Sequence, residues 1–228
     1  MSQVPQTRMS PAACRVWLEQ QLQAPSGHLW PEPDRHRVVL AGDQGETLST
    51  LRLPLPWPPL PSDRQGLPAY LTQLPAELPV HLVLLIQVGA CAMGVFEGEE
   101  ILVHKAFKKY MKRHKQGRSQ LDFANTRGKS RAGSRVRLAN AVRFFEEINS
   151  RLREWEATHA PQRLIYSCAA PLWGALFQSR VSPPFDRKDP RLVKVPRDVR
   201  IPDHEELVRV QRFIRFGYLS VYAEDQEA

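Results

Sequence analysis

Residues 81–103 read HLVLLIQVGACAMGVFEGEEILV, and this stretch decides the fold. Residues 81–88 form a nearly continuous apolar run of strand length, which is typical of a strand covered on both faces. A second apolar run at 92–96 and a third at 101–103 are separated by the acidic turn 97–100. Strand-length runs joined by short turns predict an antiparallel meander.

Beyond residue 103 the chain continues with a charged segment and then alternates helices with strands. Residues 105–115 are expected to form a further extended, charged arm. Ser134 is expected to cap a long helix, because apolar residues recur behind it at steps of three and four. These apolar positions are Leu138, Val142, Phe145, Ile148, Leu152 and Trp155.

The carboxy-terminal part repeats this alternation. The predicted elements are a strand at 164–166, a helix at 173–178, a strand at 192–195 and a helix that Asp203 caps. Strands paired by hairpins, followed by strands separated by helices, predict an α/β fold with a mixed β-sheet and flanking helices.

The domain prediction divides the chain into an N-terminal accessory region, residues 1–78, and a main domain, residues 79–228. The accessory region is expected to contain two helices, two strands and connecting loops. Its elements are a helix from Ser10-Pro11 through Leu22, a loop at 24–34, strands at 38–40 and 48–53 with a turn at 42–45, and a short helix at 68–74.

Residues 54–61, PLPWPPLP, interrupt the accessory region with five prolines. Proline removes backbone donors and fixes φ, so this segment cannot be a helix or a central strand. We interpret it as a stiff connector laid over a core. The alternative is a ligand for an aromatic groove of a partner protein.

Positive charge is concentrated in one segment. Residues 104–143 hold thirteen of the 32 lysines and arginines and a single acid, Asp122. Because the whole chain carries only +8, everything outside this segment sums to a negative charge. Adjacent cations repel one another, and a phosphate backbone relieves that repulsion with release of counterions. Aromatic and apolar residues interrupt the charges, so a nucleic-acid surface is favoured over a solvated charge run.

Other functional classes find little support in the sequence. Cys14, Cys91 and Cys168 are far apart and odd in number, which argues against a disulfide framework and a Cys-x-x-Cys metal site. The seven histidines show no zinc-type spacing, so no metal and no cofactor are expected. No apolar run approaches the roughly twenty residues that cross a bilayer, and no signal-peptide pattern is visible. A cytoplasmic protein without a membrane partner is predicted.

A Gly-x-x-Gln sequence, Gly117 to Gln120, lies within the basic segment. A glutamine amide does not ionise near neutral pH, so Gln120 is no strong base, but its two donors and one acceptor can hold a water or a hydroxyl in line. Such positioning can contribute several kcal/mol to catalysis. Gly117 permits a backbone turn unavailable to other residues. On spacing alone this motif is weak.

The surrounding motifs make the Gly-x-x-Gln sequence more specific. In order, the chain contains Gly94-Val95-Phe96, Val103-His104-Lys105-Ala106-Phe107, Gly117-Arg118-Ser119-Gln120 and Gly128-Lys129-Ser130-Arg131-Ala132-Gly133-Ser134. This series resembles the catalytic domain of the Vms-like release factor family, whose eukaryotic members include the ankyrin-repeat and zinc-finger peptidyl-tRNA hydrolase. The resemblance covers about seventy residues strongly and extends more weakly to the carboxy terminus.

The resemblance implies a fold like the middle domain of eukaryotic and archaeal peptide-chain release factors. It also implies release of stalled nascent chains from peptidyl-tRNA on the large ribosomal subunit, by endonucleolytic cleavage near the tRNA 3′ CCA end. The catalytic candidates are Gln120, Gly117 and Ser119, the last as a turn residue because no triad context surrounds it. The RNA-binding candidates are Lys112, Arg113, Lys115, Arg118, Arg127, Lys129, Arg131, Arg135 and Arg137.

Some features depart from the family pattern. Arg118 stands where the family commonly has a second glycine, which makes the loop stiffer and more cationic. The zinc finger, ankyrin repeats and partner-binding tail of eukaryotic members are missing, so the chain looks like a compact prokaryotic-type member that acts as a monomer. His104 and His114 are candidates for proton transfer, but surface or packing roles are favoured because no carboxylate partner is near in sequence.

Three hypotheses remain open. A tRNA endonuclease would remove the CCA end with the peptide, whereas a peptidyl-tRNA ester hydrolase would leave a tRNA that can be recharged. In the third, the chain is a non-catalytic module that binds the ribosome or RNA, and Gln120 is incidental.

Overall fold

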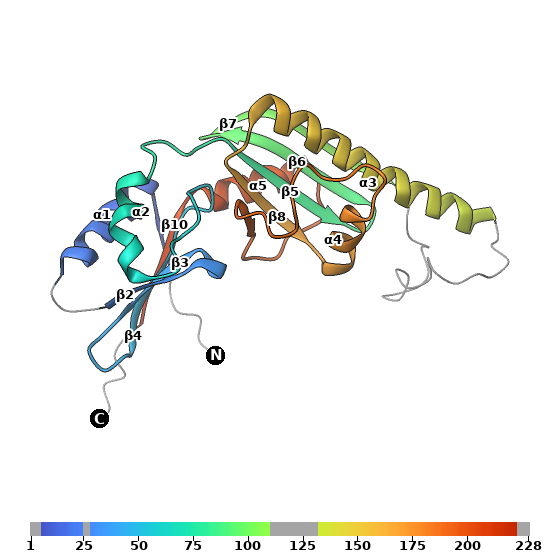
Figure 1. The fold of residues 1–228 in the computed structure, drawn as a ribbon. Helices are drawn as coiled ribbons and strands as arrows, with labels where there is room; N and C mark the ends of the chain where they lie inside the picture. Colours follow the sequence, from blue (N-terminus) through green and yellow to red (C-terminus); the bar gives the residue numbers. More distant parts are fainter. Residues whose placement is uncertain (1–5, 25–27, 110–131, 223–228) are drawn as a thin grey trace.

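A computed structural model of the chain describes residues 6–24, 28–109 and 132–222. For residues 132–138 it describes the backbone only. The described residues form two five-stranded sheets with helices packed against them (Figure 1). The first sheet has the order β1-β10-β4-β3-β2 and the second the order β7-β6-β5-β8-β9. The strands are β1 (Gln6–Met9), β2 (His28–Glu32), β3 (Arg37–Ala41), β4 (Thr47–Arg52), β5 (His81–Gln87), β6 (Ala90–Glu97), β7 (Glu100–Lys108), β8 (Arg163–Cys168), β9 (Leu192–Lys194) and β10 (Gly217–Val221). The helices are α1 (Pro11–Gln23), α2 (Leu67–Gln73), α3 (Ala132–His159), α4 (Ala170–Phe177) and α5 (His204–Ile214), with short 3₁₀ turns at Pro33–Arg35 and Arg64–Gly66.

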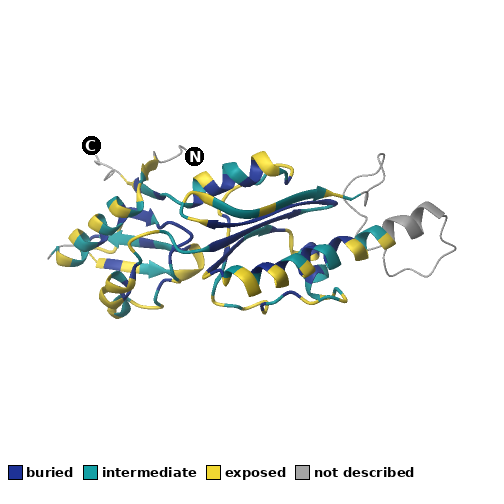
Figure 2. Ribbon diagram, turned by 90° about the horizontal axis from the view of Figure 1, so that it is seen from above, coloured by how far each residue is buried: buried dark blue, intermediate teal, exposed yellow. Residues whose placement is uncertain are grey.

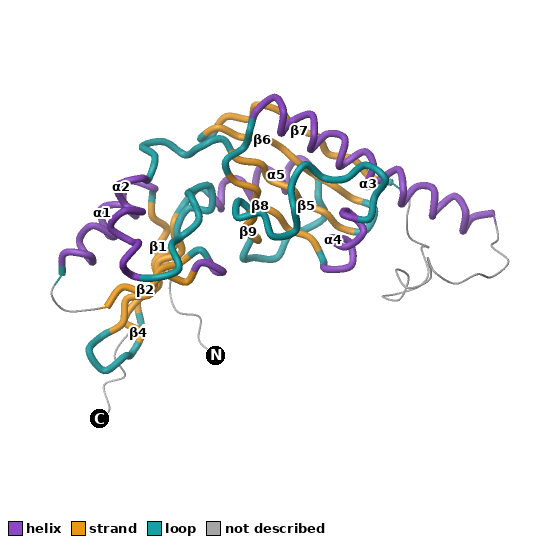
Figure 3. The backbone as a smooth tube through the Cα atoms, viewed as in Figure 1, coloured by secondary structure: helices purple, strands orange, loops and turns teal. Residues whose placement is uncertain are grey.

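The second sheet is mixed, as the sequence predicts. Strands β5, β6 and β7 form the antiparallel meander, and β8 and β9 are added parallel to β5. Helices α3 and α4 cover one face and α5 covers the other (Figures 1 and 3). Strand β5 therefore has buried side chains on both faces, which explains its continuous apolar run. Figure 2 shows buried residues running through this sheet between the helices.

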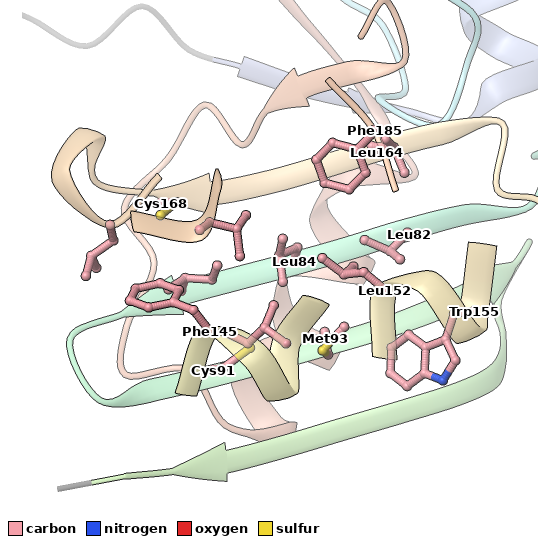
Figure 4. Packing of buried hydrophobic residues seen from close by; sticks show 14 of the residues in the cluster. Leu82, Leu84, Cys91, Met93, Phe145, Leu152, Trp155, Leu164, Cys168 and Phe185 are labelled. Atoms are coloured by element: carbon pink, nitrogen blue, oxygen red, sulfur yellow. The ribbon is translucent and has the colours of Figure 1, made fainter. Parts of the chain in front are cut away.

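Helix α3 packs on the second sheet through one apolar stripe. Phe145, Leu152 and Trp155 point toward the sheet beside Met93 (Figure 4). Ile148 belongs to the same cluster, so these four predicted core positions are confirmed.

Two details of the prediction for α3 are wrong. Val142 is 40% exposed, and Phe144, two residues further along, is fully buried. The helix also begins at Ala132, so Ser134 lies inside it and does not cap it. Phe144 lies four residues before Ile148, on the buried face of the helix, whereas Val142 lies two positions away from Phe144 and therefore faces outward.

The first sheet contains the predicted elements and three strands that were not predicted, β1, β2 and β10. The helix beginning after the Ser10 cap, the two central strands, their turn and the second helix are all confirmed. The predicted loop at 24–34 is wrong, because it contains strand β2 with Pro31 inside it. Proline is tolerated there because β2 lies at the sheet edge, where one side of the strand needs no donor.

Strand β10 pairs antiparallel with both β1 and β4. Residues 217–221 thus belong to the sheet that is otherwise built from the first 52 residues. The division between residues 78 and 79 stays a prediction. Strand β10 lies beyond this division in the sequence, but it pairs with strands of the first sheet.

The proline-rich segment is a buried connector. Leu55 is fully buried in the core beneath α5, whereas Trp57 and Leu60 are buried in the core of the first sheet. The segment therefore contributes to two cores, as the connector interpretation expects.

A buried polar joint holds the two sheets together. The Arg163 guanidinium at the start of β8 donates to Leu55 O at 3.2 Å, to Pro190 O at 3.0 Å and to His36 Nδ1 at 3.3 Å. His36 Nε2 donates in turn to Pro54 O at 3.0 Å. This pattern requires a neutral imidazole, and burial, with the Arg163 charge as the next cause, holds the His36 pKa well below its ordinary value.

Candidate nucleic-acid interface

Most of the predicted site residues lie outside the described part of the chain. These are Gln120, Gly117, Ser119, His114, Lys112, Arg113, Lys115, Arg118, Arg127, Lys129 and Arg131. Arg135 and Arg137 lie in the first two turns of α3, of which only the backbone is described. The structure therefore describes the two elements that flank this segment, β7 before it and α3 after it.

Three contacts hold the end of β7, two of them to α3 and one to the turn before β6. Lys109 Nζ forms an ion pair with Glu147 Oε2 at 2.7 Å. The Lys109 backbone N–H donates to Gly89 O at 2.9 Å, which extends the β6–β7 pairing. The Phe107 ring meets the Phe144 ring edge-on at 5.5 Å. These contacts fix where the candidate catalytic segment begins relative to the sheet. The sequence offered no signal for the Lys109–Glu147 pair, because the partners are far apart in the chain.

The segment leaves the sheet at the edge where the parallel strands end. Lys108 of β7 is paired with Ala90 of β6, and Ala90 is paired with Gln87 at the end of β5. Cys168, the end of β8, is paired with Ile86. The carboxyl ends of parallel strands are the usual position of binding sites in α/β sheets. The described anchor thus lies at the edge where a site is expected.

Exposed cations continue from the predicted RNA-binding residues onto the described anchors. Lys108 and Arg143 are both exposed, and neither is paired with a carboxylate among the residues that the structure describes. Unpaired exposed cations attract phosphate without first breaking an ion pair. The anchors therefore have the charge expected beside an RNA-binding segment.

His104 has no arrangement suited to general acid–base catalysis. It is exposed on β7, and its ring lies 4.6 Å from the ring of His204 at the start of α5. No carboxylate hydrogen-bonds to it within the described ranges, and it is four residues before the end of the strand. These observations favour a surface role for His104.

Within residues 6–24, 28–109 and 132–222, no three His, Cys, Asp or Glu side chains converge as metal ligands do. The three thiols are buried, and burial raises the pKa of Cys14 to about 11 and that of Cys168 to about 12. The pKa of Cys91 is raised further for the same reason. Protonated buried thiols are poor nucleophiles and poor metal ligands.

No helix in the described ranges is both long enough and apolar enough to span a bilayer.

The sequence of this chain is similar to a known protein family and to several named proteins. The family model for the Bacteroidetes VLRF1 release factors, bVLRF1, matches residues 81–220, which is more than half of the chain. The mouse protein "tRNA endonuclease ANKZF1" is 30% identical over 194 residues, covering 83% of this chain and 25% of its own length. The Caenorhabditis elegans protein "tRNA endonuclease vms-1" is 27% identical over 128 residues, covering 55% of this chain and 20% of its own length.

The chain thus spans about a quarter of the length of the curated relatives that it matches. Among solved structures it is similar to the "Vms1 mitochondrial localization core", with a TM-score of 0.46 and 11% identity over 92% of this chain and 83% of that one. The matched range of the family model begins with β5 and ends in β10, so it includes the whole second sheet and both anchors of the candidate segment. The chain belongs to the bVLRF1 family of release factors.

Proposed function

We propose that this chain frees stalled nascent chains by cutting peptidyl-tRNA near its 3′ CCA end, on the large ribosomal subunit in the cytoplasm. The observation that carries this proposal is the alignment of 83% of the chain with a relative named as a tRNA endonuclease. The exposed cations Lys108 on β7 and Arg143 on α3 support it, because they add to a basic segment that suits RNA. In this proposal the second sheet and its helices form the catalytic part, residues 1–78 are accessory, and the chain acts as a monomer.

Gln120 is the proposed catalytic residue, in a loop that Gly117 and Ser119 shape. Its amide would orient the ribose 2′-hydroxyl toward the adjacent phosphorus, and the predicted RNA-binding cations would stabilise the charge that develops on the phosphate oxygens. Attack by this hydroxyl breaks the phosphodiester bond to the next nucleotide and leaves a 2′,3′-cyclic phosphate on the shortened tRNA. No ionisation of Gln120 is needed, which suits an amide.

Replacement of Gln120 tests this role. Gln120→Ala is expected to lower the rate of peptide release from isolated large subunits by about 10²–10³-fold, the usual loss when one positioning donor is removed. Gln162→Ala is the matched control, because Gln162 is an exposed glutamine outside the candidate segment. Unchanged release by Gln120→Ala would refute the catalytic role and favour the non-catalytic alternative.

The release-factor name of the family favours one second candidate, hydrolysis of the peptidyl ester. Mapping the 3′ end of the tRNA after release distinguishes the two reactions. The endonuclease leaves a tRNA without CCA, whereas the esterase leaves an intact end that an aminoacyl-tRNA synthetase can recharge. In the esterase, Gln120 would orient a water molecule instead of the 2′-hydroxyl.

A further inference from the structure

A cleft of about 1160 Å³ lies between the two sheets, and none of the site residues predicted from the sequence is among the residues that line it. One wall is a face of the first sheet, with Thr50 and Arg52 on β4 and Tyr218 and Ser220 on β10. The other wall is formed by the carboxyl ends of the parallel strands β5, β8 and β9 and by the segment 195–199 that follows them. The cleft thus borders the sheet edge from which β7 leads into the candidate catalytic segment.

The wall on the first sheet has an unusual composition for a covered sheet face. Thr50 is paired with Ser220, and Arg52 is paired with Tyr218, so these four side chains share one face at the two-residue period of a strand. The opposite face carries Leu51, which is fully buried against the first core. A hydroxyl-rich and cationic face is therefore turned toward the cleft, whereas the apolar face packs against the helices.

Three cations at the cleft have no carboxylate partner among the residues described. The Arg52 guanidinium donates only to backbone carbonyls, of Leu53, Phe213 and Phe216. Burial lowers the Arg52 pKa to about 10, so the group remains charged at neutral pH. Lys194 and Arg197 are exposed at the rim, and no ion pair of either occurs within the described ranges.

The remaining charges at the cleft do not cancel these three. Arg37 is neutralised by Glu32, to which it donates at 2.7 and 3.2 Å. Arg35 lies 3.7 Å from the same carboxylate and is mostly exposed. Asp34 and Asp198 are the acids of the lining, so the five cations of the lining exceed these two acids and the adjacent Glu32 taken together.

The hydroxyl groups of Thr50 and Ser220 add donors to this positive surface. Thr50 and Ser220 are only 6% and 5% exposed, and neither hydroxyl makes a hydrogen bond to another described residue. Hydroxyl and guanidinium groups together are the common ligands of phosphate oxygens in RNA and DNA complexes.

The aromatic rings at the cleft indicate which phosphate-bearing ligand fits. Arg52 and Arg197 lie over the Phe213 ring at 4.7 and 4.6 Å, and Arg52 also lies over the Tyr218 ring at 4.7 Å. Because guanidinium groups occupy these ring faces, the rings offer no free platform on which a base would stack. The occupied ring faces favour contact with a sugar-phosphate backbone over binding of a stacked nucleotide.

We propose that this cleft binds the ribose-phosphate backbone of the RNA on which the chain acts. This inference rests on the proposed function and adds a second RNA contact to it. Lys194 and Arg197 would hold phosphates at the rim, and Thr50, Ser220 and Arg52 would form the floor. The contacts would position the RNA without reading its sequence, since they address phosphate and sugar.

The test is the binding of a fluorescein-labelled single-stranded RNA of mixed sequence, followed by anisotropy across a range of salt concentrations. Lys194→Ala with Arg197→Ala is expected to weaken binding roughly tenfold at low salt. The slope of log K against log salt should fall by about 1.4, because each phosphate contact of a single strand contributes about 0.7. Thr50→Val, which changes no charge, is expected to weaken binding without altering the slope.

The matched control is Arg180→Ala with Lys188→Ala, which removes two exposed cations that do not line the cleft. Equal losses of RNA affinity in the two double variants would overturn the proposal, because the loss would then reflect the net charge of the protein and not the cleft. Competition by inorganic phosphate or adenosine monophosphate as strong as that by the RNA would also overturn it, in favour of a small-ligand site. The Gln120→Ala variant separates the two hypotheses: if it alone loses release while the cleft variants bind RNA normally, the proposed function stands and the cleft assignment fails.

Discussion

At the scale of single residues, Gly217 shows how closely β10 approaches α1. A Cβ added at Gly217 would overlap Cys14 Sγ and lie 3.2 Å from Arg52 O. Gly217→Ala is therefore expected to lower the free energy of unfolding by about 1–3 kcal/mol, the usual cost of overpacking. Equilibrium denaturation with urea measures this change.

Two further variants test the cause. Gly174→Ala in helix α4 has no atom within 4 Å of the new Cβ and is expected to stabilise the protein by up to about 1 kcal/mol. Cys14→Ala removes the overlapping sulfur, so the double variant with Gly217→Ala should lose less stability than the two single changes added together. Strict additivity would show that the contact with Cys14 is not the reason.

At the scale of elements, helix α5 begins at the residue that the sequence marks. Asp203 Oδ1 accepts a hydrogen bond from the Glu206 backbone N–H at 2.9 Å, which confirms the predicted cap. Asp203→Ala is expected to cost about 1 kcal/mol, because a helix donor loses its partner and the helix dipole loses a favourable charge. Thermal unfolding followed by circular dichroism is the measurement.

Asp186→Ala controls for loss of one carboxylate, since Asp186 is exposed and its carboxylate makes no hydrogen bond among the described residues. A melting temperature lowered equally in both variants would contradict the capping role. The same element covers the second sheet through Leu207, Val210 and Ile214, all fully buried, so a weaker cap should expose that core.

At the scale of the whole molecule, the joint between the sheets makes stability depend on pH. His36 is neutral in the folded chain because its pKa is well below the ordinary 6.5. Below about pH 6.5 the unfolded chain takes up a proton at this position and the folded chain does not. The contribution of the neutral His36 to the free energy of unfolding is therefore fully present above pH 6.5. It is lost as the pH falls below that value, by up to about 1.4 kcal/mol per pH unit.

Urea denaturation at a series of pH values measures this slope. His36→Asn removes the ionisable group and keeps a side chain that tolerates the positive φ of 47° found there. The change in unfolding free energy per pH unit below pH 6.5 should be smaller in this variant than in the unchanged chain. Some dependence should remain, because the buried His81, whose pKa is also lowered, is present in both. His159→Asn changes a histidine outside the joint, and a slope reduced as much by this control would refute the assignment to His36.

The sequence by itself determined the elements of the second sheet, the cap at Asp203, the helix after Ser10 and the basic segment. These features depend on local patterns of apolar, charged and capping residues, which neighbouring positions display directly. The Gly-x-x-Gln sequence and its flanking motifs likewise indicated the release-factor family, and the catalytic roles of its residues stay predictions.

Only the tertiary structure decided which strands meet. Strand β10 is short, and it exists as a strand because β1 and β4, distant in the chain, provide backbone partners on both sides. Strand β2 tolerates Pro31 because it lies at an edge, and the way α3 lies on the sheet buries Phe144 and leaves Val142 exposed. The cleft also joins residues from positions 6 to 220, and no local pattern encodes such long-range proximity.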